Sequence, residues 1–226
     1  MVTKIGHRGA MGHAPENTLT SFEKAIQLGV DMIELDVRLS KDLQVVVFHD
    51  DKLKRLTNSK GYVYKKTIEE LKSLSLCGGE KITTLKEALN FINRRAKVNI
   101  EIKGKNSAGN VSQIIEEFVS EKGWNYDDFI VSSFRLSELK KIKKLNENIR
   151  LGVLKDIFPL RPVLFAKKMG AYSIHFSYRF ANKRKLKRAK REGFKVYVWT
   201  INDEKVIKKM KDLGVDGIFS DYPERL

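Results

Sequence analysis

Two histidines in this chain stand where short apolar segments end, and each has charged neighbours. His7 is followed by Arg8, and His49 is followed by Asp50, which we expect to orient the histidine beside it or to cap a turn. Imidazole titrates near neutral pH, so two histidines at one site can act as base and acid in the same reaction. Arg8 and a second cation, Lys103, suit an anionic oxygen, most naturally that of a phosphate. These residue types therefore indicate proton transfer at a phosphate group.

Three carboxylates form a second group of chemically capable residues. Glu34 and Asp36 are two positions apart in an alternating segment, so their side chains face the same side of a strand, and Glu101 belongs to a later strand-like segment. Crowded carboxylates repel one another unless a cation lies among them, and oxygen ligands suit Mg²⁺ or Ca²⁺ better than zinc. The pattern predicts one divalent cation, Mg²⁺ or Ca²⁺. The alternative is that Glu34 and Glu101 form buried ion pairs with Arg8 and Lys103, without a metal.

Segments with strand periodicity alternate with segments of helical periodicity along most of the chain. Strands are expected at 5–9, 31–39, 98–103, 129–133, 150–154, 172–176, 195–199 and 216–220. Helices are expected at about 19–28, 85–93, 111–121, 136–145, 161–169, 183–191 and 203–213. Eight strands joined by helices predict a (β/α)8 TIM barrel, which places catalytic groups at the carboxyl ends of its strands. A doubly wound open sheet is the alternative, but no glycine-rich phosphate loop follows the first strand.

An additional strand and an insertion follow the second barrel strand. The segment 45–49 is expected to pair with 31–39 around a turn near residues 41–42, which would place Glu34 opposite His49. The polar stretch 51–82 contains one weak helix at 68–74 and reads as a small cap-like insertion. We therefore expect a single domain over 1–226 that carries this insertion.

Composition limits the class of protein. Of the 226 residues, 42% are hydrophobic and 32% are charged, which excludes both wholesale disorder and a membrane bundle. The single cysteine, Cys77, excludes an internal disulfide framework. No apolar leader segment precedes His7. We therefore expect a cytoplasmic protein.

The net charge of +16 is concentrated in the second half of the chain, where residues 183–191 include seven Lys or Arg in nine. The first interpretation of this run is the solvated face of a helix, and the second is weak association with an anionic membrane surface. No aromatic residue is interleaved in the run, as single-stranded nucleic acid would favour, so we expect no specific nucleic-acid partner. The pattern predicts no particular oligomeric state.

Nine short segments resemble those of the glycerophosphodiester phosphodiesterases, in the same order and over nearly the whole chain. They are residues 7–9 (HRG), 15–18 (PENT), 34–37 (ELDV), 46–50 (VVFHD), 53–61 (LKRLTNSKG), 84–87 (TLKE), 101–103 (EIK), 199–202 (WTIN) and 216–218 (DGI) with Asp221. The chain departs from the family at Leu43, where the turn after the second strand usually has a glycine.

The resemblance implies a TIM barrel with a small cap that hydrolyses a small-molecule glycerophosphodiester to glycerol phosphate and an alcohol. By position it implies acid–base catalysis by His7 and His49, substrate binding by Arg8, Lys103 and Trp199, and metal binding by Glu34, Asp36 and Glu101. It also implies that Glu16 helps to order the site. The attacking group could be water or the substrate's own glycerol hydroxyl, which would give a cyclic phosphate.

Two other functions compete with this one. A lysophospholipase D-like activity would use the same site, and an apolar entrance near Leu74 and Leu76 would favour it. A non-enzymatic barrel that binds anions or nucleic acid is the other. A non-enzymatic barrel of this kind would have lost its catalytic residues, and the complete set of histidines and carboxylates argues against such a loss.

Overall fold

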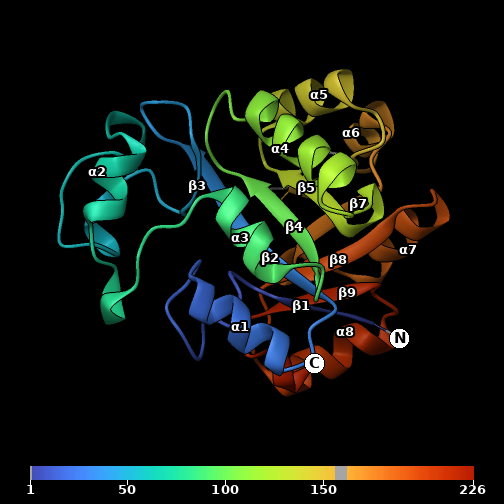
Figure 1. The fold of residues 1–226 in the computed structure, drawn as a ribbon. Coiled ribbons are helices and arrows are strands. Elements are labelled where there is room, and N and C mark those ends of the chain that lie inside the picture. Colours follow the sequence, from blue (N-terminus) through green and yellow to red (C-terminus); the bar gives the residue numbers. More distant parts are fainter. Residues whose placement is uncertain (1, 156–161) are drawn as a thin grey trace.

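The computed structural model describes residues 2–155 and 162–226, and within them eight parallel strands close into a barrel (Figure 1). The strands are β1 (Thr3–Gly6), β2 (Met32–Leu39), β4 (Lys97–Ile102), β5 (Phe129–Ser133), β6 (Arg150–Lys155), β7 (Ser173–Ser177), β8 (Lys195–Trp199) and β9 (Gly217–Ser220). β1 pairs with both β2 and β9, which closes the barrel. The predicted TIM barrel is confirmed.

The α-helices that follow the strands cover the outside of the barrel (Figure 1). They are α1 (Leu19–Gln27), α3 (Leu85–Ile92), α4 (Ala108–Glu121), α5 (Leu136–Leu145), α6 (Pro162–Met169), α7 (Lys183–Arg191) and α8 (Glu204–Asp212). Each begins and ends within a few residues of its predicted bounds. Residue 161, the first of the helix expected over 161–169, lies outside the described residues. Among the helices of the described ranges, none has the length and apolar character needed to cross a bilayer.

Polar side chains determine where two of these helices begin. Glu87 donates its backbone N–H to Thr84 Oγ1 (3.2 Å), and Thr84 donates its own to the Glu87 carboxylate (2.9 Å). This capping box starts α3. Thr18 starts α1 by accepting the backbone N–H of Ser21 at 3.2 Å. The cap on α1 also ends the loop that follows β1. This loop contains His7, Arg8 and Glu16.

The hairpin that carries His49 has a different register from the predicted one. In the structure Val37 of β2 pairs with Val47 of β3 (Val45–Val47), so Glu34 is not opposite His49 and the prediction is wrong by one residue. The connection has three residues rather than two, and its last residue, Leu43, adopts a left-handed conformation with φ of 62°. A loop with one more residue shifts every cross-strand pair by one.

Residues 51–82 form a separate small cluster of elements beside β3 (Figure 1). The elements are η1 (Leu53–Arg55), η2 (Val63–Lys65), α2 (Ile68–Ser73) and η3 (Cys77–Gly79). Their apolar side chains share one core with β3 and its extension: Val46, Phe48, Leu53, Val63, Leu71, Leu76 and Ile82. The packing of this segment therefore also fixes the chain immediately before His49.

Aromatic rings fill the middle of the barrel and separate its two ends. The ring of His175 packs against those of Tyr197 and Phe219, with centroids 5.2 and 5.3 Å away. Two glycines make this possible, because a Cβ at Gly152 would lie 2.7 Å from the His175 ring and one at Gly217 would lie 2.8 Å from the Tyr197 ring. The interior is thus packed across its centre, and cavities lie at its two ends.

Candidate active site and metal centre

The predicted site residues come together at the carboxyl ends of the strands. Those that line one cavity of about 270 Å³ are His7, Arg8, Glu34, His49, Glu101, Lys103 and Trp199. Asp36 is buried beside them, and its Oδ2 lies 3.2 Å from Arg8 Nε. Segments from β1, β2, β4 and β8 and the extension of β3 contribute these residues, so their meeting depends on barrel closure.

Glu34, Asp36 and Glu101 form a buried carboxylate cluster. One carboxylate oxygen from each lies within 4.8 Å of the others. Burial, together with the charges of the neighbouring acids, raises the pKa of Glu34 well above its usual range. Burial also raises the pKa of Glu101 to about 7 despite the nearby Lys103. Three buried carboxylates, two of which resist ionisation without a cation, fit a hard divalent ion such as Mg²⁺ or Ca²⁺.

The alternative of ion pairs without a metal accounts for only part of this cluster. Lys103 Nζ lies 2.7 Å from Glu101 Oε1 and 3.6 Å from Asp36 Oδ1. Burial alone would raise the pKa of Asp36, but Arg8 and Lys103 hold it below the usual range. Glu34 accepts the backbone N–H of Arg8 through Oε2 at 2.8 Å, whereas its buried Oε1 has no hydrogen-bond partner among the described residues. Glu34 Oε1 is therefore available to a cation.

Arg8 is held in an unusual conformation that turns its side chain into the site. β1 ends at Gly6, and Arg8 has a φ of 50°, in the left-handed region. Its Nη1 donates to Glu16 Oε1 at 2.7 Å. Its Nε is buried beside Asp36 but, within the part of the chain that is described, is not aligned with any acceptor. A buried guanidinium N–H without an acceptor is a ready donor to a phosphate oxygen.

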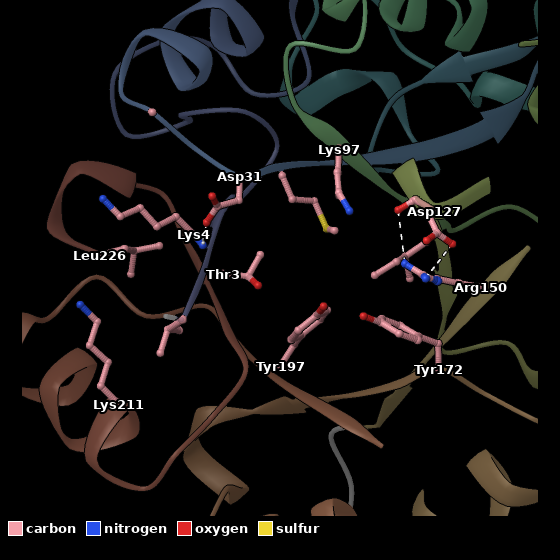
Figure 2. Close-up of a pocket in the computed structure, with 14 residues that line it drawn as sticks. Thr3, Lys4, Asp31, Lys97, Asp127, Arg150, Tyr172, Tyr197, Lys211 and Leu226 are labelled. Atoms are coloured by element: carbon pink, nitrogen blue, oxygen red, sulfur yellow. Dashed lines mark hydrogen bonds and ion pairs between the residues drawn. The ribbon is translucent and has the colours of Figure 1, made fainter. Parts of the chain in front are cut away.

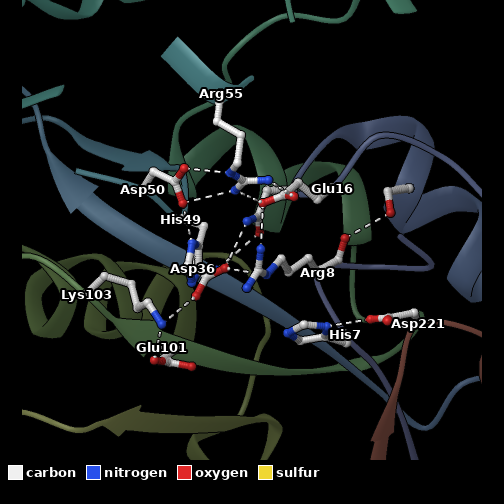
Figure 3. Close-up of polar contacts among 12 residues, drawn as sticks. His7, Arg8, Glu16, Asp36, His49, Asp50, Arg55, Glu101, Lys103 and Asp221 are labelled. Carbon is white, nitrogen blue, oxygen red and sulfur yellow. Dashed lines mark hydrogen bonds and ion pairs between the residues drawn. The ribbon is translucent and has the colours of Figure 1, made fainter. Parts of the chain in front are cut away.

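Each histidine is oriented by a carboxylate (Figure 3). His7 Nδ1 lies 2.6 Å from Asp221 Oδ1, and His49 Nδ1 lies 2.6 Å from Asp50 Oδ1. With Nδ1 engaged, Nε2 is the nitrogen of each ring that can exchange a proton with a substrate. Burial lowers the pKa of His49, although the charge of Asp36 opposes this. The expected orienting role of Asp50 agrees with this geometry.

Several residues of the site were not assigned a role from the sequence. Asp221 orients His7, and Asn17 donates Nδ2 to Asp36 Oδ2 at 3.0 Å. Arg55, from the insertion, contacts both Asp50 and Glu16. All three belong to segments that resemble the family, and this resemblance was the only sign in the sequence that they matter. Their roles could not be inferred from spacing, because their partners are distant in the chain or on another element.

An apolar wall of side chains also lines the cavity. Trp199 packs edge-to-face against Phe134 with ring centroids 5.7 Å apart, and Leu154 and Phe219 continue the wall. His175 forms part of the floor, where burial lowers its pKa to about 3 and keeps it uncharged. The cavity thus combines charged groups with an apolar surface.

A larger cavity, of about 760 Å³, opens at the opposite end of the barrel, where the strands begin (Figure 2). Its labelled side chains include Lys4, Lys97 and the hydroxyl groups of Tyr172 and Tyr197. Arg150 lies there as well, in an ion pair with an aspartate. Among the described residues no cluster of potential metal ligands occurs at this end.

Comparison with known proteins identifies the family of this chain. Residues 7–225 match the sequence model of the glycerophosphoryl diester phosphodiesterase family. The chain is 38% identical over 237 residues to a glycerophosphodiester phosphodiesterase of Bacillus altitudinis, covering 99% of this chain and 96% of that one. An Oleispira antarctica phosphodiesterase, solved with the product sn-glycerol-3-phosphate, is 32% identical with a TM-score of 0.90, covering 99% and 94%. A glycerophosphodiester phosphodiesterase of Thermotoga maritima is 35% identical with a TM-score of 0.84, covering 99% and 96%.

Proposed function

Because the chain belongs to the glycerophosphoryl diester phosphodiesterase family and is a hydrolase of that class, we propose that it cleaves glycerophosphodiesters by metal-dependent acid–base catalysis. The products would be glycerol phosphate and an alcohol, formed at the cavity that His7 and His49 line. This membership leaves the non-enzymatic interpretation without support.

The observation that carries the proposal is a pair of buried atoms without partners. Glu34 Oε1 is an acceptor and Arg8 Nε is a donor, and neither has a hydrogen-bond partner among the described residues. Buried polar groups in proteins are almost always satisfied, so unpaired ones at a cavity call for a ligand. A divalent cation would satisfy Glu34 Oε1, and an oxygen of a phosphate diester would accept a hydrogen bond from Arg8 Nε.

Glu34, Asp36 and Glu101 would hold the cation, Mg²⁺ or Ca²⁺. A hard cation, when bound, withdraws charge from phosphate oxygens. Arg8 and Lys103 neutralise the same group from the protein side through charge-assisted hydrogen bonds. The Trp199 wall excludes water beside the alcohol portion of the substrate.

The two histidines move the protons of the reaction. Nε2 of one histidine takes a proton from water or from the substrate's glycerol hydroxyl, and the freed oxygen forms a bond to phosphorus. The bond from phosphorus to the leaving alcohol oxygen breaks, and Nε2 of the other histidine protonates that oxygen. By the hydroxyl route a cyclic phosphate forms first, and water then opens it. Asp221 and Asp50 hold the rings throughout.

A lysophospholipase D-like activity at the same site is the second candidate. A cavity of about 230 Å³ lies between the first loop and the insertion, and its lining is largely apolar: Met11, Ala14, Pro15, Glu16, Leu56, Leu76 and Cys77. Leu76 borders this cavity, as the activity requires, whereas Leu74 packs against the core of the insertion. Glu16 belongs to both this cavity and the site, so an acyl chain placed here would lie beside the phosphate.

One experiment tests both candidates. Hydrolysis of glycerophosphocholine and of lysophosphatidylcholine is followed with native protein, with EDTA-treated protein, and after adding back Mg²⁺ or Ca²⁺ separately. We expect faster turnover of glycerophosphocholine, loss in EDTA and recovery with one of the ions. Preferred turnover of the lysophospholipid would favour the second candidate, and full activity in EDTA would contradict the metal.

A further inference from the structure

Arg55 lies between two carboxylates and binds both of them (Figure 3). Its Nε and Nη2 donate to the two oxygens of Asp50 at 2.6 and 3.0 Å. Its Nη1 and Nη2 donate to the two oxygens of Glu16 at 2.7 and 2.8 Å. The planar guanidinium group suits such paired contacts, which a lysine ammonium cannot reproduce.

Each of these carboxylates contacts a different functional residue. Asp50 Oδ1 lies 2.6 Å from His49 Nδ1. Glu16 Oε1 accepts Arg8 Nη1 at 2.7 Å. One side chain therefore links the orientation of a histidine to that of the phosphate-binding arginine. Arg55 itself does not line the catalytic cavity, so it cannot touch the reacting atoms.

We propose that Arg55 is a positioning residue through which the insertion, residues 51–82, controls the geometry of His49 and Arg8; this rests on the proposed function. The insertion is arranged to do so. Leu53, in the same turn as Arg55, and Phe48, which precedes His49, belong to one apolar core. The packing of that core sets the position of Arg55 relative to His49.

A purely stabilising role explains the contacts of Arg55 less well. Its side chain is 47% exposed, and its ion pair with Asp50, which is 24% exposed, is screened by solvent and contributes little to folding stability. The carboxylate of Glu16 is only 6% exposed, and its Oε2 is held by Arg55. Removal of Arg55 would leave this buried oxygen without that partner, and Glu16 would be expected to move with Arg8. The site is therefore more sensitive to Arg55 than the fold is.

The test compares Arg55→Ala and Arg55→Lys with a matched control, Arg95→Ala. Arg95 is also partly exposed and pairs with a carboxylate, Glu23, at 2.8 Å, but it lies outside the site. In both Arg55 variants kcat/KM for glycerophosphocholine should fall roughly 10- to 100-fold, as for other residues that orient catalytic groups. Thermal unfolding should stay close to that of wild type, and Arg95→Ala should keep full activity. Added guanidinium ion should restore part of the activity of Arg55→Ala.

Two further measurements distinguish a positioning role from that of a tether, in which Arg55 only holds the folded insertion against the barrel. In the background of Asp50→Asn, which already disturbs His49, Arg55→Ala should lower the rate less than it does in wild type, because its effect through Asp50 is already lost and only its effect through Glu16 on Arg8 remains. The imidazole N–H signal of His49 in NMR spectra should shift or broaden in Arg55→Ala and stay unchanged in Arg95→Ala.

Unchanged kinetics and an unchanged His49 signal in Arg55→Ala would overturn the proposal. Lower activity with unfolding of the insertion and no recovery in guanidinium would also overturn it, in favour of a tether. Absence of activity in wild type and in Arg95→Ala would instead contradict the proposed function, and with it any positioning role.

Discussion

The two ends of the barrel hold cavities of opposite character, and the smaller one is the proposed active site. At the carboxyl ends of the strands a cavity of about 270 Å³ borders a buried carboxylate cluster. At the amino ends a cavity of about 760 Å³ borders lysines and tyrosines. Volume therefore does not indicate where the chemistry occurs in this fold. What distinguishes the catalytic end is the concentration of buried, mutually opposed charges.

Energetic cost explains why that distinction is informative. Glu34 and Asp36 are 2% and 1% exposed, and placing a charge at such a depth costs several kcal/mol per ion before any partner compensates for it. At the other end Arg150 pairs with Asp127, which is 68% exposed, so this pair costs little and contributes little. Charges kept in a costly environment indicate selection for function, whereas charges at the surface do not.

The strongest test of this comparison is to remove the charge of Glu34. Glu34→Gln should lower kcat/KM by about 10³-fold or more, because a cation at a phosphate is worth several kcal/mol in the transition state. The fold should persist, and the metal-free variant should unfold at the same temperature as wild type or higher, since like charges are no longer buried together. Kinetics and thermal unfolding with and without added metal check this. Wild-type activity of Glu34→Gln at micromolar metal would contradict the cluster's assignment.

The histidines should show the next largest effect. His7→Ala and His49→Ala should each lower kcat by about 10² to 10⁴-fold with little change in stability. An activated aryl phosphodiester has a leaving group that needs no proton, so it should rescue the variant that lacks the acid and not the one that lacks the base. Near-wild-type rates of both variants on a natural diester would disprove the two-histidine mechanism.

Much of the architecture could be predicted because it depends on local periodicity. The strand at 129–133 and the helix at 183–191 were predicted with the bounds that the structure shows. The register of the hairpin could not be predicted, because it depends on whether Leu43 adopts a left-handed conformation. Residues other than glycine rarely adopt it. One such residue changes the loop length and moves every pair.

The candidate site was predictable in its residue types but not in its supporting contacts. The alternation of Glu34 and Asp36 directs both carboxylates to one face from the sequence alone. The pair of His7 and Asp221 spans 214 positions, and that of Arg55 and Glu16 spans 39. Such contacts arise only when the barrel closes and the insertion folds, so no local pattern could reveal them.

His175, in the layer that separates the two ends, should affect stability rather than catalysis. Burial lowers its pKa to about 3, below the value near 6.5 of an unfolded chain. The unfolded state therefore binds a proton as the pH falls below about 6.5 while the folded state does not, and the free energy of unfolding decreases. Between pH 7 and pH 5 wild type should lose about 2 kcal/mol more than His175→Gln. Denaturant unfolding at the two pH values measures this, and equal losses would show that the folded protein protonates this ring.

The basic helix α7 runs along the outside of the barrel and tests whether surface charge matters to the site. Charge reversal of Lys183, Arg184 and Lys187, all exposed, should leave hydrolysis of a soluble diester within a few-fold of wild type. We propose that these cations give weak association with anionic membranes, at roughly 1 kcal/mol per charge, so vesicle binding should weaken.

The matched control for α7 reverses three exposed lysines of α8, namely Lys205, Lys208 and Lys209. Co-sedimentation with vesicles of phosphatidylcholine, with and without phosphatidylglycerol, compares the two variants at several salt concentrations. Equal loss of binding in both would assign the association to net charge, and no loss in the α7 variant would rule out the proposed surface. A large fall in soluble-diester hydrolysis would show that α7 contributes to the site.

The smallest effect is expected at the larger cavity, where one strand supplies its own control. Lys97 is the first residue of β4 and lines the cavity at the amino end, whereas Lys103 follows the last residue of β4 and lines the catalytic cavity. Lys103→Gln should lower kcat/KM about 10- to 100-fold, because Lys103 Nζ lies 2.7 Å from Glu101 and Lys103 lines the proposed phosphate site. Lys97→Gln should remain within two-fold of wild type, because Lys97 is exposed and makes no ion pair among the described residues. Equal losses in the two variants would show that the amino end takes part in the reaction, and the comparison of the two ends would fail.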